Sequence, residues 1–309
     1  MFIDSFKQHF ESVADPRQSA KVTYPFFDIL FGSLCAVIAG AHGWFDIREY
    51  LLGHHKWFLE LGMFKAGIPA DDTIARTISA IKPEQFQACF LKWMAAVHTL
   101  TQGELIAIDG KTLRGSYNRE DRSSTIHMIS AYATANKLVL GQLKTDKKSN
   151  EITAIPELLQ LLDLQGALVS IDAMACQTKI AKTIIEQKGD YLLAVKGNQG
   201  NLSKAVQQAF SALRNDASSL EALQTEKQHG RIESRLCQVL DASTLEGNFS
   251  RWKGLKTLAM ITSFRTEKGK PVSMEYRYYI SSRIMSAEQV ASAVREHWAI
   301  ESMHWVLDV

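Results

Sequence analysis

Two aspartates in similar settings are the residues best suited to chemistry. Asp109 closes the apolar run 105–108 and precedes Gly110, and Asp172 closes the apolar run 168–171 and precedes Ala173. Each run has the length and composition of a buried strand. A carboxylate at the carboxyl end of such a strand lies where α/β sheets form their ligand crevices. Either aspartate alone is also typical of a turn or a helix cap, so the prediction depends on the pair.

Glu301 supplies a third carboxylate on the helix predicted near the end of the chain. Residues 297, 301, 304 and 308 fall within an arc of about 60° at 100° per residue. That face is polar and holds His297, Glu301, His304 and Asp308, whereas Ile300, Met303 and Leu307 form an apolar side suited to packing on a sheet. A solvated helix face is the simpler interpretation. A zinc site at the two histidines is disfavoured, because they lie two helical turns apart.

Three clustered carboxylates suit the cleavage of phosphodiester bonds. Two divalent cations about 3.5–4 Å apart can stabilise both the attacking and the leaving oxygen of an in-line displacement. Mg²⁺ prefers hard oxygen ligands such as carboxylates. We therefore expect Asp109, Asp172 and Glu301 to be both the catalytic residues and the metal ligands, with Mg²⁺ as the metal and Mn²⁺ as a substitute.

Basic and polar side chains close to these acids are candidates for contact with phosphate. Lys196 and Asn198 precede a predicted helix, whose N-terminal amides favour anions. The same segment is also an ordinary glycine turn, and it lacks the spacing of a nucleotide-binding P-loop. The complete set of expected DNA- or phosphate-binding residues is Lys111, Arg114, Lys196, Asn198, His229, Arg231, His297 and Trp298.

The elements that must position the three acids follow a recognisable order. From residue 105 to residue 195 the pattern predicts strand, strand, strand, helix, strand, helix, strand. A three-strand antiparallel meander followed by parallel strands with helical crossovers is the connectivity of a ribonuclease H-like α/β core. Residues 196–285 interrupt it as a strand-rich insertion. Ser286 then opens one final helix, and Gln289 completes a capping box with it.

The first hundred residues are predicted to be all-helical, with helices over 26–39, 44–61 and 83–100. Asp71, Asp72 and Thr73 are the candidate caps of a shorter helix that follows them. We expect a helical N-terminal domain over 1–100 and a catalytic domain with a mixed sheet over 101–309. The N-terminal domain is the candidate for recognising a DNA sequence.

Composition sets the broad class of the protein. The 309 residues are 46% hydrophobic and carry a net charge of only +2, so any DNA-facing surface requires charges to be segregated. The four cysteines form no C-x-x-C pair, which favours free thiols in a reducing compartment. The longest uncharged apolar stretch, 29–41, is shorter than the ~20 residues of a membrane span. We expect a soluble bacterial protein of the cytoplasm, associated with the nucleoid when it is bound to DNA.

Several blocks in order along the chain resemble insertion-sequence transposases of the ISAs1 family, including the H-repeat-associated proteins of enteric bacteria. The blocks in the second part of the chain are 107–114, 145–156, 172–174, 194–199, 297–301 and 304–309. In the first part, 15–17, 67–69 and 72–73 resemble the domain associated with that family. The resemblance spans nearly the whole sequence.

This resemblance implies a DDE transposase, which cuts and joins double-stranded DNA at the ends of an insertion sequence and works as a homo-oligomer when it is bound to DNA. Its motifs place the catalytic carboxylates on Asp109, Asp172 and Glu301. Related families have Tyr, Arg and Lys around the catalytic Glu, where this sequence has Val294, His297 and Asp308. Family members continue beyond the last block, so a C-terminally truncated copy, whose activity is in question, is expected.

Two other functions are compatible with the same residues. A non-catalytic derivative of a transposase would occupy the ends of the element without cutting them. A simple metal-dependent nuclease would cleave DNA without joining strands. Metal-dependent cleavage of end-bearing DNA separates the first alternative from a transposase, and strand joining separates the second. In every case the binding of DNA through Lys and Arg is expected to weaken with salt.

Overall fold

The computed structural model describes residues 2–18, 22–97, 103–113, 116, 125–145, 151–213, 220–228, 231–267 and 271–306. The chain divides into two compact units, Met1–His98 and Thr99–Val309. No helix within the described ranges is both long and apolar enough to cross a membrane.

The N-terminal unit is helical, as predicted. Its helices are α1 (Phe2–Phe10), α2 (Phe26–Ile38), α3 (Trp44–Gly53), α4 (His55–Glu60), α5 (Asp71–Ser79) and α6 (Pro83–Val97). An aromatic core holds them together: Phe6 stacks on Phe10 with ring centroids 4.2 Å apart, and Trp93 meets Phe6 edge-on at 5.2 Å. A buried carboxylate also braces this unit, since Asp28 on α2 accepts a 2.7 Å hydrogen bond from the backbone N–H of Phe64.

Two details of the helical prediction are wrong. The predicted helix 44–61 is two helices that meet at His54, whose φ of −110° departs from helical geometry. The cap of α5 is Ala70, with no side-chain hydrogen bond, because Asp71 already lies inside the helix. Asp71 and Asp72 instead place negative charge in the first turn, where it interacts favourably with the helix dipole.

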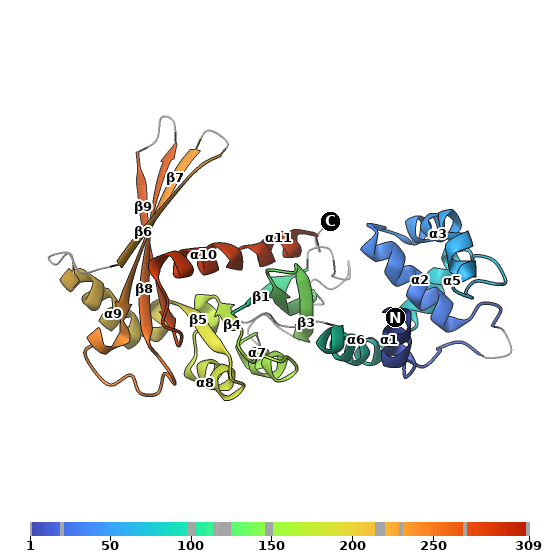
Figure 1. The fold of residues 1–309 in the computed structure, drawn as a ribbon, viewed down its shortest axis with the longest axis horizontal. Helices are drawn as coiled ribbons and strands as arrows, with labels where there is room; N and C mark the ends of the chain where they lie inside the picture. The colour runs from blue at the N-terminus through green and yellow to red at the C-terminus, as the bar shows by residue number, and fades with distance from the viewer. Residues whose placement is uncertain are drawn as a thin grey trace. The chain divides into compact units, whose positions relative to one another are not determined.

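The second unit is built on one nine-stranded sheet with the order β3-β2-β1-β4-β5-β9-β8-β7-β6 (Figure 1). Its first five strands are β1 (Leu105–Thr112), β2 (His127–Ala133), β3 (Leu138–Thr145), β4 (Leu168–Ile171) and β5 (Asp190–Val195). The first three form an antiparallel meander, and β1, β4 and β5 run parallel. This connectivity confirms the predicted α/β class with a ribonuclease H-like core.

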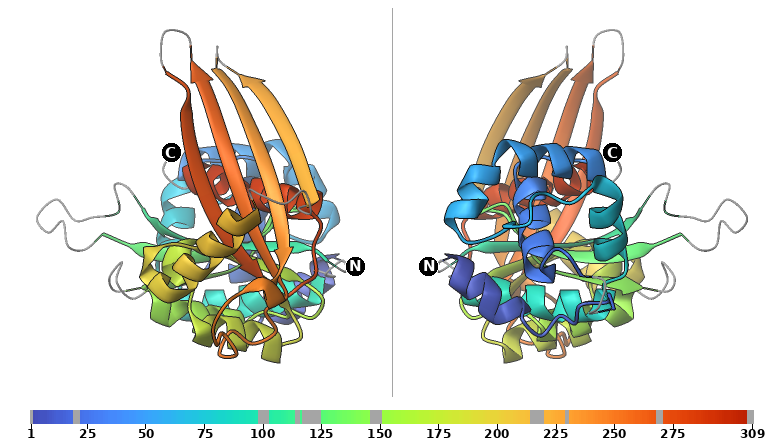
Figure 2. Two further views of the ribbon diagram at one scale, coloured as in Figure 1. Left: turned by 90° about the vertical axis from the view of Figure 1, so that its left-hand side faces the viewer. Right: turned by 90° about the vertical axis from the view of Figure 1, so that its right-hand side faces the viewer.

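The insertion lengthens the same sheet. After α9 (Gly200–Leu213) come β6 (Leu220–Gln228), β7 (Arg231–Asp241), β8 (Thr257–Glu267) and β9 (Ser273–Ser281), all antiparallel to their neighbours. The last of these, β9, pairs with β5 and so joins the insertion to the core. Figure 2 shows the four long strands rising together from the core.

Helices cover both faces of the core sheet. On one face, α7 (Glu151–Gln160) and α8 (Thr178–Glu186) pack on Ile106 and Ile108. On the other face, α10 (Ala287–His297) packs on Leu105 and α11 (Ala299–Val306) packs on Ala107. Because side chains alternate along a strand, Asp109 faces the same side as Ala107.

The predicted single C-terminal helix is divided in two. The chain leaves α10 at Trp298 and re-enters helix at Ala299. The predicted capping box is confirmed at the start of α10, where the Ser286 hydroxyl accepts from the backbone N–H of Gln289 and the Gln289 side chain accepts from the N–H of Ser286.

Candidate active site and nucleic-acid interface

Asp109 and Asp172 lie side by side where the parallel pairing of β1 with β4 ends. The prediction that Asp109 closes its strand is wrong, because β1 stays paired with β2 as far as Thr112. The register pairs Ile108 of β1 with Ile171 of β4, and each aspartate is the next residue along. Neighbouring strands are about 4.8 Å apart. Ser170, two residues before Asp172, lines a cleft on the α10 face of the sheet together with His297. Both aspartates therefore stand at one edge of the sheet, on the side that the last two helices cover.

Asp172 is held by the turn that it begins. Its Oδ1 accepts a 2.6 Å hydrogen bond from the N–H of Met174 and so caps the short 3₁₀ turn Ala173–Ala175. The side chain of Asn198 donates at 2.6 Å to the carbonyl of Ala173. The cap interpretation of Asp172 and a role in chemistry are thus compatible, because a carboxylate has a second oxygen.

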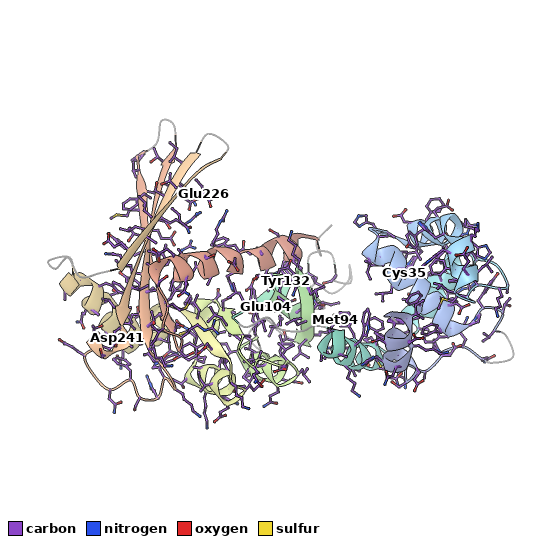
Figure 3. All side chains as sticks on the ribbon, viewed as in Figure 1. Cys35, Met94, Glu104, Tyr132, Glu226 and Asp241 are labelled. Atoms are coloured by element: carbon purple, nitrogen blue, oxygen red, sulfur yellow. The ribbon has the colours of Figure 1, made fainter. Side chains whose placement is uncertain are left out.

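Glu301 approaches the aspartates from α11. Its neighbour Ile300 is fully buried and packs with Ala107 and Tyr132 on the sheet, which fixes the side of α11 that faces the strands. Tyr132 is labelled in Figure 3. Partial burial and the negative charge of Asp109 raise the pKa of Glu301 above its ordinary value, against opposing effects of His304 and Arg277. The third predicted acid therefore lies close enough to Asp109 to sense its charge.

Two histidines join the last helices to the aspartate-bearing strands. The His297 Nδ1 lies 2.7 Å from the hydroxyl of Ser170 on β4. Burial lowers the pKa of His297, although Asp109 and Asp172 act in the opposite direction. His304, only 3% exposed, places its Nδ1 3.5 Å from Oδ2 of Asp109 on β1.

The three acids have the chemistry of ligands for a divalent cation, but their side chains are not grouped around one point. Within the described ranges, no three His, Cys, Asp or Glu side chains are close enough together to hold a metal ion. The donors are nevertheless hard carboxylate oxygens on facing elements, as Mg²⁺ requires. Partial burial raises the pKa of Glu301 most, and repulsion from Asp109, which a bound cation would relieve, raises it further. The donor set therefore fits the predicted metal.

A cleft opens beside these acids. It has a volume of about 240 Å³, and its lining includes Asp172, Lys196, His297, Trp298 and Glu301. Lys196, the residue after β5, lines the same cleft as Asp172 and Glu301 and brings a positive charge to it. The cleft thus gathers five of the residues that the sequence predicts for catalysis or phosphate binding.

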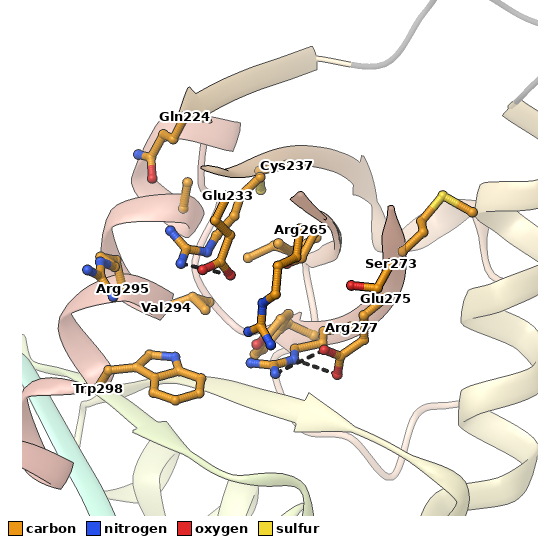
Figure 4. A pocket seen from close by; sticks show the side chains of 16 residues that line it. Gln224, Glu233, Cys237, Arg265, Ser273, Glu275, Arg277, Val294, Arg295 and Trp298 are labelled. Atoms are coloured by element: carbon orange, nitrogen blue, oxygen red, sulfur yellow. Dashed lines mark hydrogen bonds and ion pairs between the residues drawn. The ribbon is translucent and has the colours of Figure 1, made fainter. Parts of the chain in front are cut away.

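A second pocket, of about 360 Å³, continues from this cleft over the inserted strands (Figure 4). The two share Glu275, Arg277, Tyr279, Val294 and Trp298. Four arginines line the second pocket, one each from β7, β8, β9 and α10: Arg235, Arg265, Arg277 and Arg295. We call the cleft and this pocket together the arginine groove.

The arginines of the groove are held in defined positions. Arg277 makes two hydrogen bonds to Glu275, at 3.0 and 3.2 Å, and its guanidinium lies 5.3 Å from the ring centre of Trp298. Arg235 pairs with Glu233 at 3.0 Å, and Arg295 pairs with Glu226 (labelled in Figure 3) at 3.2 Å. The lining of this pocket includes four arginines but only two glutamates, Glu233 and Glu275. Its net charge is therefore positive.

The remaining predicted contacts have different outcomes. Lys111 lies on β1, two residues after Asp109, and so points to the same face of the strand. Asn198 donates its side-chain N–H to Ala173, which makes it a brace of the Asp172 turn. Arg231 pairs in β7 with Gln228 and Glu267. The side chain of Arg231, and Arg114 and His229 as a whole, lie outside the described residues.

Sequence reasoning missed Ser170 and three arginines of the groove, Arg265, Arg277 and Arg295. The fourth, Arg235, lies in the basic segment 229–235 that also holds the predicted contacts His229 and Arg231. An alternating strand pattern says which residues share a face, but it does not say which helix covers that face. Arginines on three neighbouring strands could in principle have indicated a basic surface on the insertion. Their register, with Arg277 opposite Ile261 and Arg265 opposite Glu233, comes only from the paired sheet.

Comparisons with known proteins agree with this architecture. Residues 7–94 match the family model described as DDE_Tnp_1-associated, and residues 100–309 match the Transposase DDE domain. The whole chain is 47% identical to the "H repeat-associated putative transposase YhhI" of Escherichia coli (strain K12) and covers 83% of it. It is also 48% identical over its full length to the "Putative transposase YncI" of Escherichia coli O157:H7, of which it covers 80%. The chain therefore belongs to the DDE transposases, in the group of H-repeat-associated proteins.

Proposed function

We propose that this transposase cleaves phosphodiester bonds at the ends of an insertion sequence of the ISAs1 family and transfers the strands to target DNA. Asp109, Asp172 and Glu301 are its catalytic carboxylates. One observation carries the proposal: the register of β1 and β4 sets the two aspartates side by side, and α11 brings Glu301 to the same face of the sheet.

The metal role of these acids follows from their chemistry. Asp109, Asp172 and Glu301 would hold Mg²⁺ or Mn²⁺, which when bound activates the attacking oxygen and stabilises the leaving one. The chain itself positions the acids. The backbone of Met174 orients Asp172, and Asn198 steadies that turn. Lys196 provides a positive charge in the cleft for a backbone phosphate.

DNA is proposed to follow the arginine groove away from the acids. Arg277 and Arg265 present guanidinium groups, which bind phosphate oxygens well. Trp298 is 40% exposed at the junction of the two pockets, so one face is accessible to a base or sugar. Two copies of the chain are proposed to act together, because a transposition event joins two ends.

The test of catalysis uses end-bearing duplex DNA with Mg²⁺. Asp109→Asn, Asp172→Asn and Glu301→Gln should each reduce cleavage and strand joining by about 10³-fold or more, as is common when a group of one catalytic set is removed. Glu157→Gln, an exposed acid on α7, is the matched control and should retain activity. Full activity in Asp109→Asn would exclude the proposal.

The DNA path is tested by the salt dependence of binding. Each lost phosphate contact lowers the slope of log affinity against log salt by about 0.9. Arg265→Gln should therefore bind more weakly at low salt and show a smaller slope, whereas Arg251→Gln, in the exposed loop before β8, should match the parent protein. Equal slopes in all three proteins would remove the groove from the DNA path.

A second candidate function is a non-catalytic protein that occupies the element ends. It is favoured by one observation, that no three candidate ligands within the described ranges are close enough to hold a metal. Binding of end DNA without Mg²⁺-dependent cleavage, unaffected by Asp109→Asn, would support it. Cleavage without strand joining would instead indicate a simple nuclease.

A further inference from the structure

We propose that His297 and His304 are positioning residues that clasp the Glu301 helix onto the two aspartate-bearing strands. The proposal rests on the catalytic roles proposed above for Asp109, Asp172 and Glu301. His297 contacts β4 through Ser170, and His304 contacts β1 through Asp109 itself. Glu301 lies between the two histidines in sequence, and the charge of His304 acts on it.

Within the residues that the structure describes, the helix that bears Glu301 rests on a small apolar cluster. Its buried members are Ala107, Tyr132 and Ile300, and Val139, Ala299 and Met303 pack against them. By contrast, α10 packs on a larger cluster that reaches from Leu105 to Tyr279. The α-helical hydrogen-bonding pattern is also interrupted between the two helices. There the backbone N–H of Trp298 donates to the carbonyl of Arg295, and that of Glu301 donates to the carbonyl of Trp298. Polar contacts therefore have more influence on α11 than on a deeply packed helix.

His297 fixes the start of this segment. Its contact with Ser170 is short, at 2.7 Å, and the serine side chain is 3% exposed. Ser170 lies two residues before Asp172 on the same face of β4. A bond to Ser170 therefore anchors the junction of α10 and α11 directly beside one catalytic aspartate.

His304 fixes the far end of the segment. It is 3% exposed, and its Nε2 finds no hydrogen-bond partner among the residues that the structure describes. Leaving a buried polar group unpaired costs about 1–3 kcal/mol. A leucine would fill the same space without that cost. The contact of Nδ1 with Asp109 is therefore the one interaction that a histidine makes here and a leucine cannot.

Together the contacts bridge both strands. Residues 297 and 304 are separated by about 10 Å along a helix, at 1.5 Å per residue. Neighbouring strands are about 4.8 Å apart, so a helix that crosses them can reach both. The carboxylate of Glu301 is thereby held near Asp109 despite the repulsion that raises the pKa of Glu301.

The first measurement is hydrogen–deuterium exchange of the metal-free, DNA-free full chain. Ser170→Ala removes the His297 contact, and His304→Leu removes the Asp109 contact while it keeps the volume. Both should raise the exchange of amides 300–306 about threefold or more, by loosening the helix locally. Ser282→Ala removes another buried serine hydroxyl, which donates to Asp190 and accepts from Tyr191, and should leave α11 unchanged.

The second measurement is the Mn²⁺ concentration for half-maximal cleavage of end-bearing DNA. Loss of a residue that orients a metal ligand costs about 10–100-fold in metal affinity or activity. His304→Leu and Ser170→Ala should raise the half-maximal Mn²⁺ concentration within that range, with a much smaller loss at saturating Mn²⁺. His304→Asn keeps an N–H donor near the position of Nδ1 and should recover most of the loss.

The outcomes separate the two proposals. Unchanged exchange of α11 in both variants would overturn the clasp. Faster exchange with an unchanged Mn²⁺ requirement would also overturn it, because the histidines would then be structural only. If the parent chain shows no Mn²⁺-dependent cleavage, the proposed function fails, and the exchange experiment alone decides whether the histidines hold the helix.

Discussion

At the scale of single residues, the candidate site brings three carboxyl groups of like charge to one face of the sheet. Asp109 and Asp172 lie next to each other where the pairing of β1 with β4 ends, and Glu301 is close enough to Asp109 to sense its charge. Like charges at this range disfavour the ionised form of a carboxyl group, which raises its pKa. Such an arrangement costs stability in the metal-free protein and becomes favourable when a cation binds.

Glu301→Gln should therefore stabilise the metal-free protein at neutral pH. Because the pKa of Glu301 is raised on folding, the native state binds this proton more tightly, and stability falls as pH rises from the ordinary pKa of about 4.5 through the raised one. Glu301→Gln has no carboxyl group to ionise at this position, so it does not lose stability in this pH range. Urea midpoints measured with a chelator should be higher for Glu301→Gln at pH 7 and equal to the parent at pH 4.

Glu288→Gln provides a control of opposite sign. Hydrogen bonds from the Glu288 backbone N–H and from Ser286 lower the pKa of Glu288. A lowered pKa adds stability above the ordinary value, which is lost as pH falls through the lowered one. This variant should be less stable than the parent at pH 7. A lower midpoint for Glu301→Gln at pH 7 would contradict the repulsion described here.

Gly110 is required by a close approach from the opposite face of β1. A Cβ at this position would lie 2.6 Å from the carboxyl carbon of Glu151, which is only 5% exposed at the start of α7. The absence of a side chain thus allows a buried carboxylate to sit against the strand immediately after Asp109.

Gly110→Ala should lower the free energy of unfolding by about 1–3 kcal/mol, as overpacking of a tight interior does. Gly197→Ala is the matched control, since a Cβ there meets nothing within 4 Å. It should be neutral or stabilising by up to about 1 kcal/mol. Urea unfolding measures both, and equal effects would show that Glu151 moves aside freely.

At the scale of elements, the site depends on how one helical segment is started and held. The capping box at Ser286 stabilises the start of α10. Further along, His297 contacts Ser170 on β4 and His304 contacts Asp109 on β1. Between them, α10 also forms one wall of the arginine groove through Val294 and Arg295. The same helix therefore positions both the third acid and part of the basic surface.

Ser286→Ala should cost about 1 kcal/mol of stability, because it leaves the Gln289 N–H without its partner. Ser292→Ala, on the same helix, removes only an exposed bond to Glu296 and should change stability by less than about 0.5 kcal/mol. Chemical unfolding of the full chain compares the two. An equal loss in both variants would mean that the box does not stabilise α10.

At the scale of the whole molecule, each compact unit has a core of its own. The core of the N-terminal unit is confined to residues 6–94 and includes Phe6, Phe31, Phe58 and Trp93. The second unit buries both faces of one extended sheet. Separate cores are what allow two parts of a chain to fold independently.

A fragment of residues 1–98 should therefore fold alone, with helical circular dichroism and a cooperative urea transition. Phe6→Ala in this fragment should lower stability by about 3–5 kcal/mol and largely unfold it. Trp57→Ala, at an exposed aromatic residue, is the control and should keep the transition. A non-cooperative fragment would show that its core needs the remainder of the chain.

Much of this architecture is encoded locally. Apolar runs of strand length before Asp109 and Asp172 predict both strands, although β1 continues past Asp109 to Thr112 because it stays paired with β2. The capping box at Ser286 was also legible, because its two partners are three residues apart. The division of helix 44–61 and the break at Trp298 were missed, since local helix propensity continues across both.

The sequence by itself determined the order of the elements, the core topology and the three candidate acids, because each depends on short-range periodicity. Only the tertiary structure decided what surrounds those acids. The pairing of β9 with β5 brings three arginines of the insertion, which are far from Asp109 and Asp172 in the sequence, alongside the cleft. The packing of α11 on the sheet places His304 next to Asp109. The paired residues of β5 and β9 lie 83 to 89 positions apart in the chain, and Asp109 and His304 lie 195 positions apart, so no local pattern specifies these contacts.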